Sequence, residues 1–393
     1  MFADTRRPMR LADIGYRNRL RLSRLFQNIR GVVMPVFIPG LELSRLYYEE
    51  AVKPILDSHF PVLDYAAARI GPGSDILGYD SERSTDHSWG PRLQLFLTES
   101  DHNLHACQIS EALSQHLPVE FRGYPTNFVD IEGENGRLMT PITTGPIKHW
   151  VDILTTQSFF TEMLGLDPNG PIEAIDWLTF SEQALLSITR GAVYIDEPGE
   201  LTAMRKRFEY YANDVWLYVL AAQWTRISQE EPFMARCAEA GDEIGSRIIA
   251  ARLVHDIMRL CFLIEKRYAP YSKWLGTAFR KLALAEILHP VLEAVLDASD
   301  WRDRQRKLST AHERVAAAHN ELGITEPLPT EVSQFHGRPY EVIDAARFAE
   351  VIRAQIRDPE VLALAPDIGS IDQFSHSTDI LSRPDRRRSL RAV

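Results

Sequence analysis

Apolar and polar positions along residues 43–123 predict a small α/β unit. Residues 43–60 carry apolar side chains at helical spacing, which is typical of a helix with one buried face. Residues 62–71 and 89–97 are short apolar stretches that indicate two strands, joined through the turn "GPGS" and a loop. A helix is expected over residues 102–116 and a third short strand over residues 118–123. The predicted order is therefore helix, strand, Gly-Ser turn, strand, helix, strand.

The second half of the chain has a different, mainly helical pattern. Residues 125–150 are rich in Gly, Pro, Asn and Thr, which is typical of a loop. A strand-like stretch follows at residues 191–196, and from residue 201 to about residue 320 the apolar positions recur at helical spacing. Packed antiparallel helices bury such faces economically. We therefore predict an α+β fold, in which a small mixed-sheet domain is followed by a mainly α-helical bundle domain.

These patterns also give the expected domain boundaries. We expect an α/β domain at residues 34–145, a connector at residues 146–200 and a helical domain at residues 201–375. No internal repeat of fixed period interrupts this division.

Both ends of the chain are basic. Residues 1–33 carry eight arginines and two aspartates. They are either an extension that precedes a true start at Met34 or a basic amphipathic arm for a partner. Residues 376–393 end in "RPDRRRSLRAV" and are expected to form a disordered basic tail.

Overall charge and cysteine content narrow the class of protein. The chain has 44 Lys and Arg against 54 Asp and Glu, a net charge of −10. Binding to a nucleic-acid backbone requires a basic face, so this balance favours a small-molecule or protein substrate over a polynucleotide. Three widely spaced cysteines are expected to be buried structural thiols, with no disulfide scaffold or zinc knuckle: Cys107, Cys237 and Cys261. The sequence has no membrane-length apolar run and no secretory pattern at its start, so we expect a cytoplasmic protein.

The turn after the first predicted strand carries residues suited to phosphoryl transfer. That chemistry needs backbone N–H groups around the phosphates and divalent cations that neutralise charge. Gly73 lets the backbone approach a phosphate closely, and Ser74 can donate its hydroxyl. Asp86 is expected at the mouth of the next strand, where position 88 would share its side. Glu120 lies on the third predicted strand, and its carboxylate would meet Asp86 over one cation if the strands are neighbours.

Taken singly, each of these residues is more often structural. Together they resemble the signature of the polymerase-β-type nucleotidyltransferase superfamily: a Gly-Ser turn, an eleven-residue gap, an aspartate and an alternating apolar strand. The helical region resembles the C-terminal domains of kanamycin-nucleotidyltransferase-like proteins. From about Met34 the chain more closely resembles an uncharacterised bacterial family, the domain-of-unknown-function 4037 family. The stretches that carry this closer likeness are "SRLYYEEAVKPIL", "STDHSWGPRLQLFL" and "YAPYSKWLGTAF".

The resemblance implies a role for each matching residue. Gly73 and Ser74 would take the nucleotide phosphates, and Asp86 would ligate Mg²⁺, or alternatively Mn²⁺. Glu120 would stand for the third carboxylate of the superfamily, a place for which Asp130 competes. ATP is the expected nucleotide substrate.

The sequence departs from the superfamily at Ser88, where a second carboxylate is expected. One charge fewer would hold the metals less tightly. However, Mg²⁺ is commonly bound by one or two carboxylates together with substrate phosphates and water, so Asp86 with Glu120 can suffice. Ser88 or His87 would then contribute a polar contact. Arg92, at the start of the second strand, either reaches a phosphate or forms a structural ion pair.

In the helical half, Tyr271 and Lys273 lie in a tight turn between two predicted helices. Helical domains of related architecture close over the nucleotide and supply a cation to the triphosphate. Lys273 is the candidate for that cation, and an exposed lysine without such a role is the alternative.

Other charged residues of the helical half admit two interpretations. Arg252, Asp256 and Arg259 share one helical face, which indicates either an ion network that lines a cleft or, as we prefer, a packing surface stabilised by ion pairs. Glu230 and Glu231 lie at a helix end, where one of them could act as a base or recognise a cationic acceptor. The histidines show no metal-ligand spacing, so we predict no zinc site.

The leading hypothesis is a Mg-dependent nucleotidyltransferase that moves a nucleoside monophosphate from an NTP to a hydroxyl of a small molecule or protein. Acceptor choice would depend on the cleft between the two halves and on the loop at residues 125–150. The alternatives are a catalytically weakened nucleotide-binding regulator, a nucleotidyltransferase directed at a tRNA end, and a helical interaction protein on an inert α/β base. No membrane partner is expected, and the sequence leaves the oligomeric state open.

Overall fold

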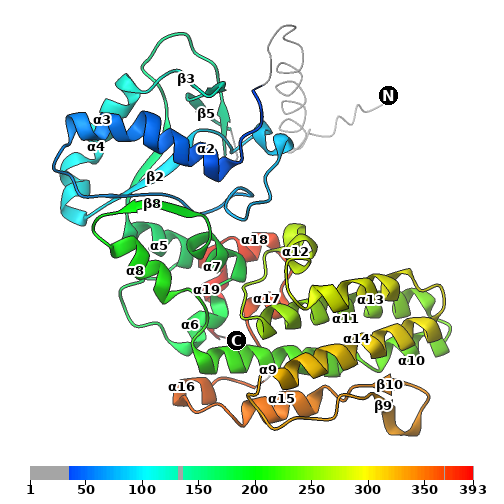
Figure 1. The fold of residues 1–393 in the computed structure, drawn as a ribbon. Coiled ribbons are helices and arrows are strands. Elements are labelled where there is room, and N and C mark those ends of the chain that lie inside the picture. Colours follow the sequence, from blue (N-terminus) through cyan, green and yellow to red (C-terminus); the bar gives the residue numbers. More distant parts are fainter. Residues whose placement is uncertain (1–34, 132–135, 367, 393) are drawn as a thin grey trace, which may run out of the picture. The chain divides into compact units, whose positions relative to one another are not determined.

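The structure is a computed structural model that describes residues 35–131, 136–366 and 368–392 (Figure 1). The chain forms two compact units. Unit 1 contains the described residues up to Arg69, Gly73–Ile153 and Ala192–Ile195, and unit 2 contains Ile70–Pro72, Leu154–Gly191 and the described residues from Asp196 onward. A four-stranded sheet with helices lies in unit 1, and unit 2 is mostly helical, so the predicted α+β fold is confirmed.

Unit 1 begins with a nearly continuous helical segment where the periodicity predicts one. It consists of α2 (Gly40–Tyr47), a π-helical turn (Tyr48–Val52) and α3 (Lys53–His59). Leu43, Tyr47 and Leu56 are buried on its inner face. The π-helical turn shifts the helical register between α2 and α3.

The central sheet of unit 1 has the strand order β7-β2-β1-β8. Its strands are β1 (Ala66–Arg69), β2 (Arg92–Leu97), β7 (Trp150–Thr155) and β8 (Ala192–Asp196). β1 and β2 pair antiparallel, with Ala67 opposite Leu95. Side chains alternate between the two faces of a strand, and Leu93, Leu95 and Leu97 join the apolar core with α2, α3 and α4. Arg92, Trp150 and Asp152 therefore occupy the opposite face, which we call the polar face of the sheet.

The helix predicted after the second strand is α4 (Glu99–His116), which follows β2 directly. Its N-cap is Thr98, whose hydroxyl accepts the Asp101 N–H. The third predicted strand forms as β3, but it does not join the four-stranded sheet. β3 (Glu120–Phe121) has two residues, and among the described residues it pairs with β4 (Tyr124–Pro125) in a two-stranded hairpin.

The predicted loop at residues 125–150 contains a second hairpin. β5 (Phe128–Asp130) pairs antiparallel with β6 (Arg137–Met139), and β7 follows at the end of the segment. Three-residue strands give too short an alternation to be told from a loop by sequence pattern. The connector predicted at residues 146–200 divides between the two units, because β7 and β8 extend the sheet of unit 1.

Unit 2 begins with four short helices and continues with a bundle. The short helices are α5 (Thr156–Leu164), α6 (Ala174–Thr179), α7 (Glu182–Thr189) and α8 (Glu200–Arg207). The bundle contains α9 (Asn213–Glu230), α10 (Phe233–Glu239), α11 (Glu243–Ile264), α12 (Ser272–Phe279), α13 (Ala285–Asp297) and α14 (Trp301–Glu321). α11 packs against α9, α10, α13 and α14, as the helical periodicity of residues 201–320 predicts (Figure 1).

The last part of unit 2 is ordered around the bundle. A small hairpin of β9 (Ser333–Gln334) and β10 (Glu341–Val342) precedes α15 (Ala346–Arg353), which packs on α9 through stacked Trp224 and Phe348 rings. The remaining helices are α16 (Pro359–Leu362), α17 (Ile371–Phe374), α18 (Thr378–Leu381) and α19 (Pro384–Arg388).

The prediction of a disordered tail at residues 376–393 is wrong. Arg387 is 1% exposed and donates hydrogen bonds to the Ser181 hydroxyl and to the carbonyls of Leu381 and Met163. Arg388 pairs with Asp176. The basic composition that suggested a solvated tail instead supplies donors for buried acceptors of unit 2. The predicted extension at residues 1–33 lies outside the described residues.

Candidate functional site

The turn after β1 is fixed by a buried carboxylate that lies between two arginines. Asp75 Oδ2 accepts from Arg69 Nε at 2.8 Å, and Asp75 Oδ1 accepts from Arg69 Nη2 at 3.1 Å and from Arg92 Nη2 at 3.0 Å. All three side chains are almost fully buried. Gly73 has φ +147° and lies so close to them that a Cβ atom would collide with all three side chains. The Gly73–Ser74 turn therefore rests directly on the arginine pair.

The charges of this group keep the turn electropositive. Burial alone would raise the pKa of the Asp75 carboxyl, but the neighbouring Arg69 and Arg92 outweigh burial and hold that pKa below its usual value. Burial lowers the pKa of the Arg92 guanidinium to about 10, Arg69 acts in the same direction and Asp75 opposes both. At neutral pH two buried cations therefore share one carboxylate behind the turn. Of the two roles predicted for Arg92, the structure shows the ion pair.

β7 brings a second carboxylate and a third arginine to the polar face. Arg137 Nη1 lies 3.7 Å from Asp152 Oδ1. The Trp150 ring has the Arg92 guanidinium 4.7 Å from its centroid and the Arg137 guanidinium 5.0 Å from it. Burial raises the pKa of the Asp152 carboxyl despite the opposing charges of Arg137, Arg69 and Arg92. A carboxylate with a raised pKa is suited to accept a proton from a reacting hydroxyl.

We call Arg69, Asp75, Arg92, Arg137 and Asp152 the arginine–aspartate cluster. Only Arg92 was a candidate from the sequence. The stretch "HWVDILTT" does alternate as a strand does, and that signal could have found Asp152, but nothing local shows that this strand lies beside β2.

Asp86 and Ser88 do not lie on a strand. Asp86 ends a 3₁₀-helix (Glu82–Asp86), is exposed, and its Oδ1 is 2.8 Å from Nδ1 of His87. Ser88 has a left-handed backbone with φ +49°, and its N–H donates to the carbonyl of Arg137. The expectation that both side chains point to one side of a strand is therefore wrong, because β2 begins only at Arg92. The segment is nevertheless fixed beside Arg137 of the cluster.

The two candidates for a third carboxylate are both exposed. Glu120 lies on the β3–β4 hairpin, outside the four-stranded sheet, so the premise that its strand neighbours that of Asp86 is wrong. Asp130 pairs with Lys148 at 2.5 Å and with Arg137 at 3.3 Å. The strand that does neighbour β2 is β7, which carries Asp152.

The resemblance implies magnesium, but the two carboxylates of the arginine–aspartate cluster are engaged by arginines and do not fit a magnesium centre. In the described part of the chain, no three His, Cys, Asp or Glu side chains are grouped so that they could hold a metal ion. Both oxygens of Asp75 accept hydrogen bonds from arginines, and Asp152 faces Arg137. Mg²⁺ prefers carboxylate oxygens that are free to coordinate it. Asp86 with Glu120 as metal ligands stays a prediction.

The candidates of the helical half belong to unit 2. Lys273 lies in the first turn of α12, is exposed, and its Nζ is 5.0 Å from the centroid of the Trp274 ring. Its contact with a nucleotide stays a prediction. Glu231 is structural, because its carboxylate accepts the N–H groups of Ile343 at 2.8 Å and Ala345 at 3.1 Å.

The three charged residues predicted on one face of α11 form ion pairs with residues of other helices. Arg252, Asp256 and Arg259 do not pair with one another: Arg252 pairs with Glu230, Asp256 with Arg226, and Arg259 with Glu182. The prediction that all three cysteines are buried is wrong for two of them. Cys261 is buried, Cys237 is partly exposed and Cys107 is exposed on α4.

Comparisons with known proteins support part of the family assignment. Residues 177–275 match the profile of a family described as "Domain of unknown function (DUF4037)", which confirms the predicted likeness over that stretch of the chain. No curated protein matches the sequence. Among solved structures, a nucleotidyltransferase-like protein from Exiguobacterium sibiricum 255-15 is 10% identical and matches over 78% of this chain and 87% of that chain. The TM-score of that match is 0.31, too low to establish a shared fold. In the described residues, no helix combines the length and apolar character that a membrane span needs.

Proposed function

We propose that unit 1 binds a nucleoside triphosphate with its phosphates at the Gly73–Ser74 turn. The observation that carries this proposal is the charge directly behind the turn, where the two buried arginines Arg69 and Arg92 face the single carboxylate of Asp75. Charge in a site of low dielectric is screened weakly, so the surplus cation favours an anion at the turn. The glycine backbone lets a phosphate approach the N–H groups closely.

Arg137 is the arginine of the cluster that a ligand can reach. Its side chain is 32% exposed, whereas that of Arg92 is 7% exposed. Arg137 also lies against the Trp150 ring, which limits its rotamers and so reduces the entropy that binding would cost. Hydrogen bonds between guanidinium and phosphate are charge-assisted and stronger than neutral ones.

We expect Arg137→Ala to weaken ATP binding by about tenfold or more, which corresponds to about 1.4 kcal/mol. Calorimetric titration with ATP and with a non-hydrolysable analogue, with and without Mg²⁺, measures the change. Arg122→Ala is the matched control, because Arg122 is an exposed arginine of unit 1 that pairs with Glu50 on the surface. Equal affinities of the Arg137 variant and the unmodified protein would contradict the proposal, as would an equal loss in both variants.

A second candidate function is transfer of the nucleoside monophosphate to a hydroxyl of a small molecule or protein. The acceptor oxygen would attack the α-phosphorus, the bond from that phosphorus to the bridging oxygen would break, and pyrophosphate would leave with those electrons. Asp152 would take the proton of the acceptor hydroxyl. The sequence resemblance and the raised pKa of Asp152 support this candidate. The arginine-paired carboxylates and Ser88 instead favour binding without turnover, and the net charge of −10 disfavours a tRNA end as acceptor.

Two substitutions distinguish transfer from binding. If transfer occurs, Asp152→Asn should lower the rate of pyrophosphate release by about 100-fold and leave ATP affinity within about twofold. Ser88→Asp would restore the missing carboxylate at a left-handed position that Asp tolerates, and it should raise the rate. Glu120→Gln, on the separate hairpin, is the control. Tight ATP binding with no pyrophosphate release in any of these proteins would identify a nucleotide-binding regulator.

A further inference from the structure

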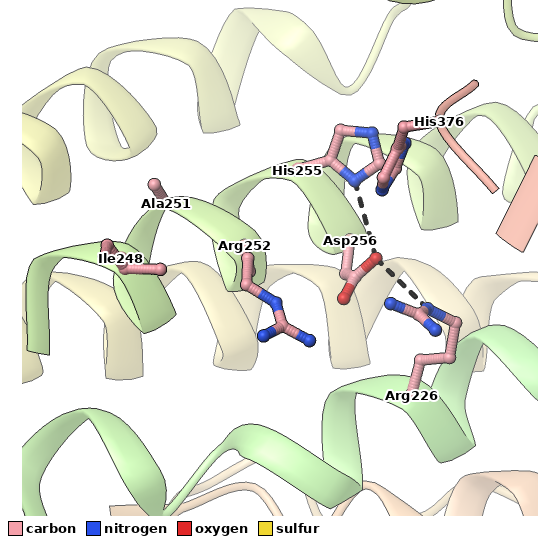
Figure 2. A pocket seen from close by; sticks show the side chains of 7 residues that line it. All are labelled: Arg226, Ile248, Ala251, Arg252, His255, Asp256 and His376. Carbon is pink, nitrogen blue, oxygen red and sulfur yellow. Dashed lines mark ion pairs between the residues drawn. The ribbon is translucent and has the colours of Figure 1, made fainter. Parts of the chain in front are cut away.

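One face of α11 in unit 2 lines a pocket that the nucleotide proposal does not use. The pocket has a volume of about 290 Å³, near the lower limit of small-molecule sites. From α11 it is lined by Ile248, Ala251, Arg252, His255 and Asp256, which follow the spacing of a single helical face. Arg226 of α9 and His376, between α17 and α18, complete the lining (Figure 2).

Asp256 is a buried carboxylate with one oxygen unused. Its side chain is 2% exposed. Oδ1 accepts from Gln223 Nε2 at 3.2 Å. It also lies 3.5 Å from both Arg226 Nε and His255 Nδ1 (Figure 2). Oδ2 is equally inaccessible and has no hydrogen-bond partner among the described residues. Buried carboxylate oxygens are normally hydrogen-bonded, so Oδ2 lacks a donor.

Charged and apolar groups surround this carboxylate, and one of them is a second carboxylate, Glu230, which pairs with Arg252 and whose pKa is raised by burial and by the charge of Asp256. Arg226 Nε lies within ion-pair distance of Asp256, yet it has no hydrogen-bond acceptor among the described residues. The rings of His255 and His376 meet edge to face, with centroids 4.9 Å apart. Ile248 is 55% exposed beside these polar groups. The lining thus offers a donor without an acceptor, an acceptor without a donor, and an apolar wall.

We propose that this pocket binds a small organic anion that also carries a hydroxyl group. The anionic group, a carboxylate or a phosphate, would accept hydrogen bonds from Arg226, with His376 beside it. The hydroxyl would donate to Asp256 Oδ2 once a change of that side chain's rotamer turns the buried oxygen toward the pocket, and the carbon skeleton would lie against Ile248 and Ala251. Such a ligand satisfies each unpaired buried group with the complementary chemistry. This site is independent of nucleotide binding in unit 1.

A matched set of probes tests each part of the proposal on the full-length protein. 4-Hydroxybenzoate has the anion, the hydroxyl and the ring; benzoate lacks the hydroxyl, phenol lacks the anion, and 4-hydroxyphenyl phosphate replaces the carboxylate by a phosphate. We expect 4-hydroxybenzoate or 4-hydroxyphenyl phosphate to bind with a Kd of about 1 mM or tighter in calorimetry. Benzoate and phenol should each bind at least about tenfold more weakly, because each leaves one buried group unpaired. Failure of both complete probes to bind at about 10 mM would overturn the proposal.

Substitutions place the binding in this pocket. Arg226→Gln should weaken the complete probes by about tenfold or more, and Asp256→Asn should abolish the preference for 4-hydroxybenzoate over benzoate. If either variant fails to fold, Arg252→Gln, which changes a largely exposed arginine of the lining, tests the same site. Arg247→Ala is the control, since Arg247 is an exposed arginine of α11 outside the pocket. An equal loss in this control would overturn the assignment.

The result also separates this site from the nucleotide proposal. Arg137→Ala should leave probe binding unchanged, and Arg226→Gln should leave ATP binding unchanged. Loss of probe binding in the Arg137 variant would place the anion in unit 1 and overturn the proposal.

Discussion

Asp75→Asn is expected to destabilise unit 1 by about 3–5 kcal/mol, the cost typical of removing one partner from a buried charge pair. The substitution keeps the shape of the side chain but leaves Arg69 and Arg92 buried without the carboxylate that now lies between them. Hydrogen exchange of the β1 and β2 amides, followed by mass spectrometry, reads out unit 1 separately from the helices of unit 2. Protection of β2 should fall by two orders of magnitude or more at this cost.

The control and the pH dependence make this result specific. Asp57→Asn removes an exposed pair with Lys53, and it should cost about 0.5 kcal/mol or less. Because the native pKa of Asp75 lies below its unfolded value, the unfolded chain binds more protons as the pH falls. The contribution of Asp75 is therefore present above pH ~4 and is lost as the pH falls below that value. Asp75→Asn should lack this component of acid sensitivity. Unchanged β2 protection in Asp75→Asn would show that the buried pair does not stabilise unit 1.

Gly73→Ala is expected to be the most damaging single-methyl change in the turn, at about 3 kcal/mol or more. Gly73 has φ +147°, and a Cβ atom there would lie within 3.0 Å of Asp75, Arg69 and Arg92. The strained backbone and the collision add, because the buried arginines have little room to move. ATP binding should be lost together with the stability of β1 and β2. Chemical denaturation and ATP titration measure the two effects.

Gly78→Ala separates strain from collision in the same loop. Gly78 also has a positive φ, +68°, but a Cβ atom there would meet nothing within 4 Å. We expect a cost of about 1 kcal/mol from the backbone alone and little change in ATP affinity. If the two alanine variants are equally stable and bind ATP equally well, the close contact between Gly73 and the arginines contributes neither to stability nor to ATP binding.

Much of the fold follows from local pattern, and the errors are non-local. The helical segment from Gly40 to His59, the strands β1 and β2, and the long helices α9, α11 and α14 lie where periodicity places them. The expected neighbour of β2 was wrong. β7 lies beside β2 although the two strands are more than fifty residues apart in the sequence, and such a pairing leaves no local signal. The tail was also wrong, because composition does not record that Arg387 meets buried acceptors.

The candidate site divides in the same way. Sequence spacing identified the Gly73–Ser74 turn, and Arg92 was given two open roles. Sequence spacing missed Asp152 and Arg137. These residues join the cluster only because β7 and β6 bring them to the polar face near Arg92. The spacing also placed Asp86 at the mouth of the second strand, whereas Asp86 ends a 3₁₀-helix and the strand begins only at Arg92.

The sequence by itself determined the helices, the two central strands and the glycine turn, because these depend on side chains two to four positions apart. Only the tertiary structure decided which charges meet. It closed Asp75 between Arg69 and Arg92, set Asp152 against Arg137, and left Asp256 with an unpaired oxygen in the pocket of unit 2. The physical reason is that the interaction between charges depends on their separation in space and on their burial, and distance along the chain specifies neither.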